Sequence, residues 1–370
     1  MRLRQMMKDG EFAKYWIGQT FSVFGSNVAT FALPLTAVYF LEASPLQVGL
    51  LQFMNGVPFL LFSLLIGVWT DRVRRLRLMI AADFGRALLM GLIPIFYLTG
   101  WFNIYQLCFV ALGIGMLSVM FETACQAFLP VFVGKGKLVE ANSALQFSLS
   151  MSQISGPGVA GLMIRLFAAP LALTVNALAF LASAVFLARI RFHEERRTSG
   201  SARSLRFREA TEGLRVLLRH PVLRPLTLAM GGINLFFSAF LAVYYLYLDK
   251  AFGFSSAMTG MVLTIGALGA TAAVFVTGKL STMMSPGMVV YQKTTSDRWL
   301  GRVTAGSKFF LGGLMPVGSL LGGVLGEYAG LRSTLFIGAA GITLMVVWML
   351  LSRIRTASDR QLESEYFISS

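Results

Sequence analysis

Three ionisable residues lie inside long apolar stretches of this sequence, where they could carry a charge or a proton. Glu122 lies in the apolar stretch 104–128, about 9 Å by helical rise from its basic end. Asp83 and Arg86 are three positions apart in the stretch 78–98, so a helix would place them on one face. Charges at membrane depth are costly and usually functional. We therefore expect Glu122 to bind a proton. The alternatives are a hydrogen bond to a neighbouring helix and a position facing a cytoplasmic vestibule. Asp83 and Arg86 should form a structural ion pair near the inner membrane surface.

A second group of charged residues forms a short basic turn, which contains Gly67, Asp71, Arg72, Arg75 and Arg77. The apolar stretches before and after it are each long enough to cross a bilayer as a helix, which takes roughly 20 residues. So short a connection makes the two helices antiparallel neighbours. Arginines in such a turn remain on the cytoplasmic face of a membrane, so the turn also predicts the orientation of the chain.

A third group combines glycine with proline in the stretch 138–166, where Gly156, Pro157 and Gly161 occur. Proline removes a backbone hydrogen bond and bends a helix, and glycine lets a neighbouring helix approach closely. Tight packing and a hinge are therefore both open interpretations of this motif.

Polar side chains that could line a binding cavity are few. If such residues form a cavity together with nearby aromatic side chains, its ligand should be bulky and largely apolar, with a few hydrogen-bonding groups. The candidates are Gln19, Asn27, Asn55, Gln146, Gln153, Asn234 and Tyr244.

The composition fits a membrane protein. Of 370 residues, 56% are hydrophobic and 13% are charged, whereas soluble domains contain about 25% charged residues. The net charge of +15 comes from basic residues in the loops between apolar stretches, which argues against a nucleic-acid partner. Apolar stretches that predict spanning helices occur at about 15–41, 48–69, 78–98, 104–128, 138–166, 171–188, 222–248, 258–280, 300–327 and 331–351, and the fourth should end at Pro130.

The chain divides into two halves that echo each other. Residues 1–190 predict a bundle of six helices, 191–221 a cytoplasmic linker with an amphipathic helix, 222–355 a second bundle and 356–370 a cytoplasmic tail. Both bundles end in Arg-Ile-Arg, about 160 residues apart, which is the offset that parallel six-helix repeats would give. The second bundle has only four clear helices, and Ser281–Arg298 stands where two more would be expected.

These motifs resemble those of the major facilitator superfamily. The basic turn is similar to the superfamily signature between helices 2 and 3, with Arg74 in place of a glycine. The stretch 155–161 is similar to the Gly-Pro motif that antiporters carry in helix 5. The segments 213–221, 297–303 and 315–323 resemble the branch that contains enterobactin exporters and macrolide efflux pumps.

The resemblance implies an all-α polytopic membrane protein with the major facilitator fold. This fold has two parallel six-helix pseudo-repeats, the second here reduced to about four clear helices, so that about ten spans remain. In this fold Asp71 would act as a latch that contacts the start of helix 11, and the helix 5 motif as a hinge that closes a proton leak. The resemblance also implies a monomeric proton-coupled exporter of a lipophilic drug, macrolide or siderophore, embedded in the lipids of the bacterial cytoplasmic membrane with both termini cytoplasmic.

Other classes of function have little support in the sequence. There is no ATP-binding motif, no cluster of nucleophile and base, and no metal-ligand spacing, so we expect no enzyme activity, cofactor or metal. Cys108 and Cys125 lie about 25 Å apart along one predicted helix, too far for a disulfide. The alternative to a transporter is a degenerate, transport-inactive relative that acts at most as a membrane binding or scaffold protein.

Overall fold

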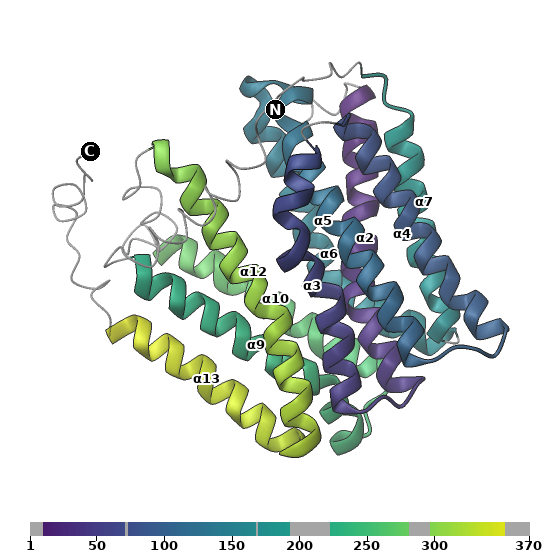
Figure 1. Cartoon of the computed structure of the whole chain (residues 1–370), viewed down its shortest axis with the longest axis vertical. Helices are drawn as coiled ribbons and strands as arrows, with labels where there is room; N and C mark the ends of the chain where they lie inside the picture. The colour runs from purple at the N-terminus through teal and green to yellow at the C-terminus, as the bar shows by residue number, and fades with distance from the viewer. Residues whose placement is uncertain (1–9, 71–72, 168, 193–222, 281–296, 352–370) are drawn as a thin grey trace.

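The computed structural model describes residues 10–70, 73–167, 169–192, 223–280 and 297–351 (Figure 1). These residues form long α-helices joined by short turns. The helices are α2 (Gly10–Tyr39), α3 (Pro45–Thr70), α4 (Arg75–Leu98), α5 (Ile104–Val133), α6 (Leu138–Leu166), α7 (Ala169–Ala188), α9 (Leu223–Phe252), α10 (Ser256–Leu280), α12 (Asp297–Tyr328) and α13 (Leu331–Leu351), with a short 3-10 turn, η1 (Lys135–Lys137), before α6.

Nine candidate membrane spans are found within the described ranges, by length and hydropathy. The long helix outside that set is α6, which carries Glu140, Gln146, Gln153 and several serines. The fold is therefore an all-α polytopic membrane fold, as the sequence predicts. The linker around the predicted amphipathic helix, the carboxy-terminal tail and residues 281–296 lie outside the described residues.

The expectation that the fourth spanning helix ends at Pro130 is wrong. Helix α5 continues through Pro130 to Val133 and ends at Gly134, whose φ of 74° lies in the left-handed region that glycine adopts without strain. Proline removes one backbone hydrogen bond and is tolerated inside membrane helices, where neighbouring groups compensate for that bond. Glycine therefore ends this helix, and proline does not.

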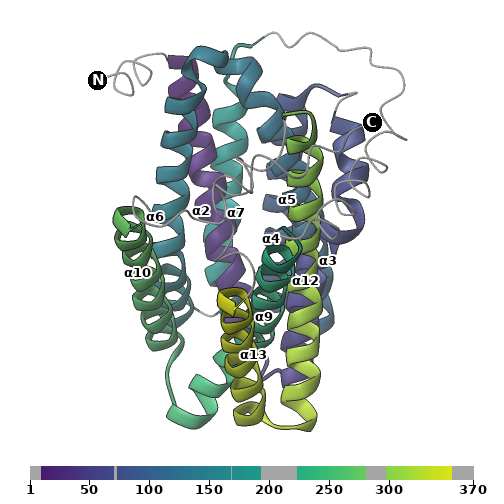
Figure 2. The same cartoon turned by 90° about the vertical axis from the view of Figure 1, so that its left-hand side faces the viewer.

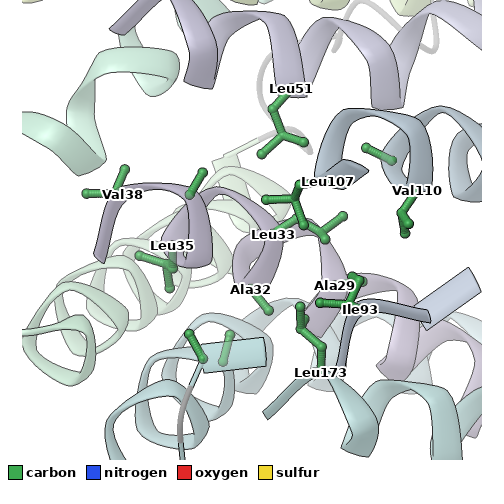
Figure 3. Packing of buried hydrophobic residues seen from close by; sticks show 14 of the residues in the cluster. Ala29, Ala32, Leu33, Leu35, Val38, Leu51, Ile93, Leu107, Val110 and Leu173 are labelled. Carbon is green, nitrogen blue, oxygen red and sulfur yellow. The ribbon is translucent and has the colours of Figure 1, made fainter. Parts of the chain in front are cut away.

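The amino-terminal half, α2 to α7, is a bundle in which α2 packs against α6 and α7, α3 against α5, and α4 against α5 and α7. Most of its interior is apolar. Figure 3 shows ten labelled residues of the larger buried cluster, which come from α2, α3, α4, α5 and α7. A second cluster, at the end where α2 begins, includes the buried rings of Tyr15 and Phe128 with the neighbouring Phe132.

The carboxy-terminal half is organised around α9, which packs against both α12 and α13. Helix α10 makes most of its contacts with α6 of the other half, and α12 packs against α3 of the other half as well as against α9. In Figure 2, α10 lies beside α6 on one side of the molecule and α12 lies near α3 on the other. The two halves therefore meet mainly through two helix pairs, α3 with α12 and α6 with α10, and α9 makes smaller contacts with α3 and α2.

We call the end of the molecule at which α2 ends and α3 and α10 begin the junction end. The two halves contact each other there. Figure 1 shows α12 beside α3 at this end, with the two helices further apart toward the opposite end, where α2 begins. At the junction end, a methyl group on Gly326 of α12 would lie 2.9 Å from Pro45 Cβ at the start of α3. The halves are thus in close contact at one end of the molecule.

Candidate functional site

The most strongly enclosed polar group in the amino-terminal half is the pair formed by Asp83 and Arg86 of α4. The two side chains form an ion pair, and the residues are 0% and 1% exposed. They lie in the interior of the bundle, surrounded by α2, α5 and α7. The planar guanidinium group lies 4.4 Å from the ring centre of Phe121 and 4.6 Å from that of Phe180. Rings at this distance attract a cation through their electron-rich faces.

Serine hydroxyls complete the surroundings of Arg86. Its Nη2 atom donates to Ser22 Oγ at 2.9 Å, and its Nη1 atom donates to Ser26 Oγ at 3.0 Å and to Ser118 Oγ at 3.4 Å. Ser22 in turn donates to Asp83 Oδ1 at 3.1 Å. The sequence analysis missed these serines, although Ser22 and Ser26 are four positions apart and therefore share one face of α2.

Glu122 of α5 is exposed, in contrast to the Asp83–Arg86 pair. It follows Phe121, whose ring faces Arg86, and lies one helical turn after Ser118, which accepts a hydrogen bond from Arg86. The helical spacing therefore places the exposed acid Glu122 on the part of α5 that contacts Arg86 through Ser118 and Phe121.

Only part of the basic turn falls within the described residues. Asp71 and Arg72 lie outside them, so the predicted latch contact of Asp71 is not described, and Gly67 belongs to the last turns of α3. Arg75 begins α4, and its Nη1 atom donates to the carbonyl oxygen of Ala127 in α5 at 3.1 Å. Arg77 is exposed. The described part of the turn is therefore anchored to its own half of the molecule.

The glycine and proline motif of α6 lies where neighbouring helices come close. A methyl group on Gly156 would lie 3.4 Å from Asn27 Cβ of α2. A methyl group on Gly260 of α10 would lie 2.5 Å from the Pro157 carbonyl oxygen and 3.1 Å from Gly161 Cα. Ser256 Oγ also donates to the Gly161 carbonyl oxygen at 3.2 Å. The motif therefore makes the tight packing between the halves, and the hinge interpretation stays a prediction.

Two of the predicted cavity residues, Asn27 and Asn234, each join two helices of their own half. Asn27 Nδ2 of α2 donates to Ser152 Oγ of α6 at 3.0 Å, and Asn234 Nδ2 of α9 donates to the Leu311 carbonyl oxygen of α12 at 3.2 Å. Both bonds join the first helix of a half to its next-to-last helix, so the two halves use asparagine in the same way.

The other cavity candidates differ in exposure. Gln146 and Gln153 of α6 are exposed, and Asn55 of α3 is half-buried. Tyr244 of α9 is half-buried and stacks on Phe240 at a ring-centre distance of 5.2 Å. Gln19 is only 2% exposed, which differs from the expectation that it lines a cavity, because it lies on the side of α2 that faces the interior of its own bundle.

Two polar contacts between the halves were not foreseen from the sequence. The hydroxyl groups of Tyr39 in α2 and Thr259 in α10 are hydrogen-bonded at 2.6 Å. At the start of α3, the backbone N–H of Leu46 donates to Glu327 Oε2 of α12 at 3.3 Å. A carboxylate at a helix N-terminus is favourable because it meets unpaired N–H groups and the positive end of the helix dipole. Both contacts lie at the junction end.

The model of the Major Facilitator Superfamily matches residues 15–291 of this sequence, which is most of the chain. The chain belongs to this superfamily. The superfamily consists of membrane transporters, and the arrangement of two helical halves agrees with that assignment.

Relatives with similar sequences are bacterial proteins. The chain is 30% identical over 215 residues to the uncharacterized MFS-type transporter YfiS of Bacillus subtilis, and this match covers 55% of the chain and 48% of the relative. It is 26% identical over 215 residues to the multidrug efflux pump Tap of Mycolicibacterium fortuitum, covering 55% and 51%. The chain thus spans about half the length of these two relatives in the matched regions.

Solved structures share the fold at low sequence identity. A mutant form of the nucleoside transporter NupG has a TM-score of 0.70 at 10% identity, and the match covers 92% of this chain and 98% of the transporter. A bacterial homolog of the human lysosomal transporter Spinster, in an inward-facing and occupied conformation, has a TM-score of 0.65 at 12% identity, covering 96% and 98%. These likenesses concern the fold alone.

Proposed function

We propose that this chain is a secondary active transporter that exports a lipophilic small molecule in exchange for protons by alternating access. The observation that carries the proposal is the meeting of two helical halves through α3 with α12 and α6 with α10, with close contacts at the junction end. Rocking of two such halves about the contacts between them would expose a central site to one side of the membrane at a time.

The charge distribution supports an orientation for this transporter. The end opposite the junction end carries Arg74, Arg75, Arg77, Arg189 and Arg191 within the described residues. Positively charged loops favour the cytoplasmic side. The junction end is therefore proposed to face outward, so that the structure corresponds to an inward-facing state. In the opposite state Asp71 would act as the inner latch.

Glu122 is the proposed proton-binding residue. It is exposed, and it lies one helical turn after Ser118, which contacts the enclosed Asp83–Arg86 pair. A carboxyl group that is close to a buried network can link its protonation to the packing of that network.

The substrate class is proposed from the aromatic and amide side chains of α9 and from one relative. Phe240 and Tyr244 stack on each other, and Asn234 lies on the same helix. Such a surface suits a bulky apolar molecule that has a few hydrogen-bonding groups. The 26% identical relative from Mycolicibacterium fortuitum is a multidrug efflux pump, which supports an amphiphilic drug-like substrate.

The test is transport by the full chain in everted membrane vesicles from a host that lacks its main efflux pumps. Ethidium, Hoechst 33342, erythromycin and a catecholate siderophore serve as probes, each with and without an imposed pH gradient. Uptake of at least one probe that requires the gradient supports the proposal. Uptake of none, by protein that is present in the membrane at normal levels, contradicts it.

A second candidate function is favoured by one feature of the carboxy-terminal half. Only residues 281–296 separate α10 from α12, and this interval is shorter than the roughly 20 residues that one spanning helix needs. A transport-inactive relative that binds ligands or partners would have such a shortened half. Binding of a probe to the purified chain without gradient-driven uptake would favour this alternative, and a variant lengthened between α10 and α12 would then be expected to gain transport.

A further inference from the structure

The Arg86 guanidinium pairs with one carboxyl group and contacts the helix that carries a second, and the two carboxyl groups differ in their exposure. Asp83 is 0% exposed and pairs with Arg86 inside the bundle, whereas Glu122 is exposed. Arg86 also reaches α5 directly, because its Nη1 atom donates to Ser118 Oγ, four positions before Glu122 on the same face of that helix. The guanidinium thus connects the enclosed acid Asp83 of α4 with the helix that carries the exposed acid Glu122.

We infer that Arg86 is a positioning residue that divides its charge between Asp83 and Glu122, so that the proton affinity of Glu122 depends on Asp83 through Arg86. This inference rests on the proposed role of Glu122 as the proton-binding residue. The sequence analysis gave Asp83 and Arg86 a purely structural role. The geometry extends that role, because a pair that served only to hold α4 in place would have no need of a contact with α5.

Several contacts of Arg86 are weak, so that Arg86 could replace them with contacts to other groups. Its hydrogen bond to Ser118 Oγ is long, at 3.4 Å, and its Nε atom has no hydrogen-bond partner among the described residues. The rings of Phe121 and Phe180 attract the cation without fixing its direction. The second carboxylate oxygen of Asp83, Oδ2, likewise has no hydrogen-bond partner in the described structure. The hydrogen bond of Arg86 with α5 is therefore weaker than its bonds with Asp83 and Ser22.

Other ionisable groups near Glu122 in α5 could also change its proton affinity. Helix α3 has no ionisable residue, and the hydroxyl of Tyr15 is hydrogen-bonded to Cys125 Sγ at 3.2 Å. The groups on the surrounding elements include Asp83, Arg86 and Arg75 of α4, Tyr15 of α2, Cys125 of α5 itself, Glu140 of α6 and Lys137 of η1. Asp83 and Arg86 are the members of this set that form a buried ion pair.

Removing the charge of Arg86 and removing the charge of Asp83 should therefore shift the proton affinity of Glu122 in opposite directions. With Arg86→Gln, the negative form of Glu122 loses a nearby cation, so its proton should be held to higher pH. With Asp83→Asn, Arg86 is free to favour Glu122, so the proton should be lost at lower pH. An opposite charge at close range changes a carboxyl proton affinity by about tenfold or more. We expect each variant to move the titration midpoint by about one pH unit.

The test is an infrared titration of the protonated carboxyl band on the purified full-length chain in detergent. Lys14→Gln is the matched control, because Lys14 forms a half-buried ion pair with Glu11 at the same three-residue spacing, at 2.7 Å. The control should leave the midpoint unchanged, as should Arg86→Lys, which keeps the charge. The double variant Asp83→Asn with Arg86→Gln should return the midpoint toward that of the wild type.

Midpoints that do not move, or that move in the same direction in both single variants, overturn the inference. If the single variants do not fold, the Ser118→Ala variant is the deciding test, because it removes only the hydrogen bond from Arg86 to Ser118 of α5. This variant should raise the midpoint by a smaller amount, and an unchanged midpoint rejects the inference. A titrating band that Glu122→Gln fails to remove also rejects it. Correct midpoint shifts without gradient-driven uptake of any of the four probes would instead contradict the proposed transport function alone.

Discussion

Gly49 of α3 and Gly323 of α12 lie so close together that a methyl group on Gly49 would be 2.7 Å from the Gly323 Cα atom. This is the tightest kind of approach that two helices can make, and it joins the two halves of the molecule. Glycine is needed because any side chain at this position would meet backbone atoms, which cannot move aside as a flexible side chain can. The contact is thus both a source of stability and a constraint on rocking.

Gly49→Ala is expected to push α3 and α12 apart and to lower stability. Overpacking of a tight contact costs typically 1–3 kcal/mol, so we expect a loss of about 2 kcal/mol. Thermal unfolding of the purified chain in detergent measures it. Gly91→Ala is the matched control, because a methyl group on Gly91 of α4 would meet no atom within 4 Å. The control should be neutral or slightly stabilising, since alanine favours helix by about 1 kcal/mol over glycine. Equal losses in both variants would contradict the prediction.

Tyr39→Phe is expected to loosen the junction end without disturbing either half. The substitution removes the 2.6 Å hydrogen bond to Thr259, which links α2 to α10 across the two halves. A net hydrogen bond contributes about 1 kcal/mol, so the population of separated states should rise about fivefold. Spin labels at Leu98 and Tyr328, both exposed at this end, report the distance between the halves by pulsed electron paramagnetic resonance.

The control for this measurement is Tyr105→Phe, because Tyr105 is 73% exposed. This control should give the distance distribution of the wild type. A Tyr39→Phe distribution that equals the wild-type distribution would show that the hydroxyl contact does not hold the halves together.

The helices could be predicted from the sequence because apolar length is a local property. Leu138–Leu166 and Leu331–Leu351 agree with the predicted stretches at both ends, and the pairing of Asp83 with Arg86 followed from their three-residue spacing. What surrounds that pair could not be predicted, because Ser22 and Ser118 come from helices distant in the sequence. The same holds for Tyr39 and Thr259, which are 220 positions apart.

Other differences have specific physical causes. The sequence predicted a helix end at Pro130, but a membrane helix tolerates one missing backbone hydrogen bond, and Gly134 ends the helix instead. Gln19 was expected in a cavity because it is polar. Its position on α2 faces the interior of the bundle, and polarity alone does not reveal which side of a helix faces a cavity.

Asn27→Ala is expected to weaken the amino-terminal half modestly. The variant loses the 3.0 Å bond from Asn27 Nδ2 to Ser152 Oγ, which joins α2 to α6. Hydrogen bonds between membrane helices contribute about 1 kcal/mol, so the loss of stability should be of that size. Unfolding of the purified chain in increasing concentrations of a denaturing detergent measures the loss. Asn142→Ala, at an exposed position of α6, is the control and should be neutral. If Asn142→Ala lost as much stability as Asn27→Ala, the effect would come from the packing of α6 in general and not from the hydrogen bond.

Glu122→Gln is expected to abolish proton-driven efflux while the protein remains folded. Glutamine has nearly the same shape as glutamic acid but cannot release a proton, so the substitution separates charge from packing. Because Glu122 is exposed, its replacement should leave the buried Asp83–Arg86 pair and the amount of protein in the membrane unchanged. Ethidium uptake into everted vesicles under an imposed pH gradient measures the effect, and Glu140→Gln in the first turn of α6 is the control. Uptake that survives in Glu122→Gln at the wild-type rate would move the proton site elsewhere, and Asp83 would then be the next residue to examine, since it is the enclosed carboxyl group of the same network.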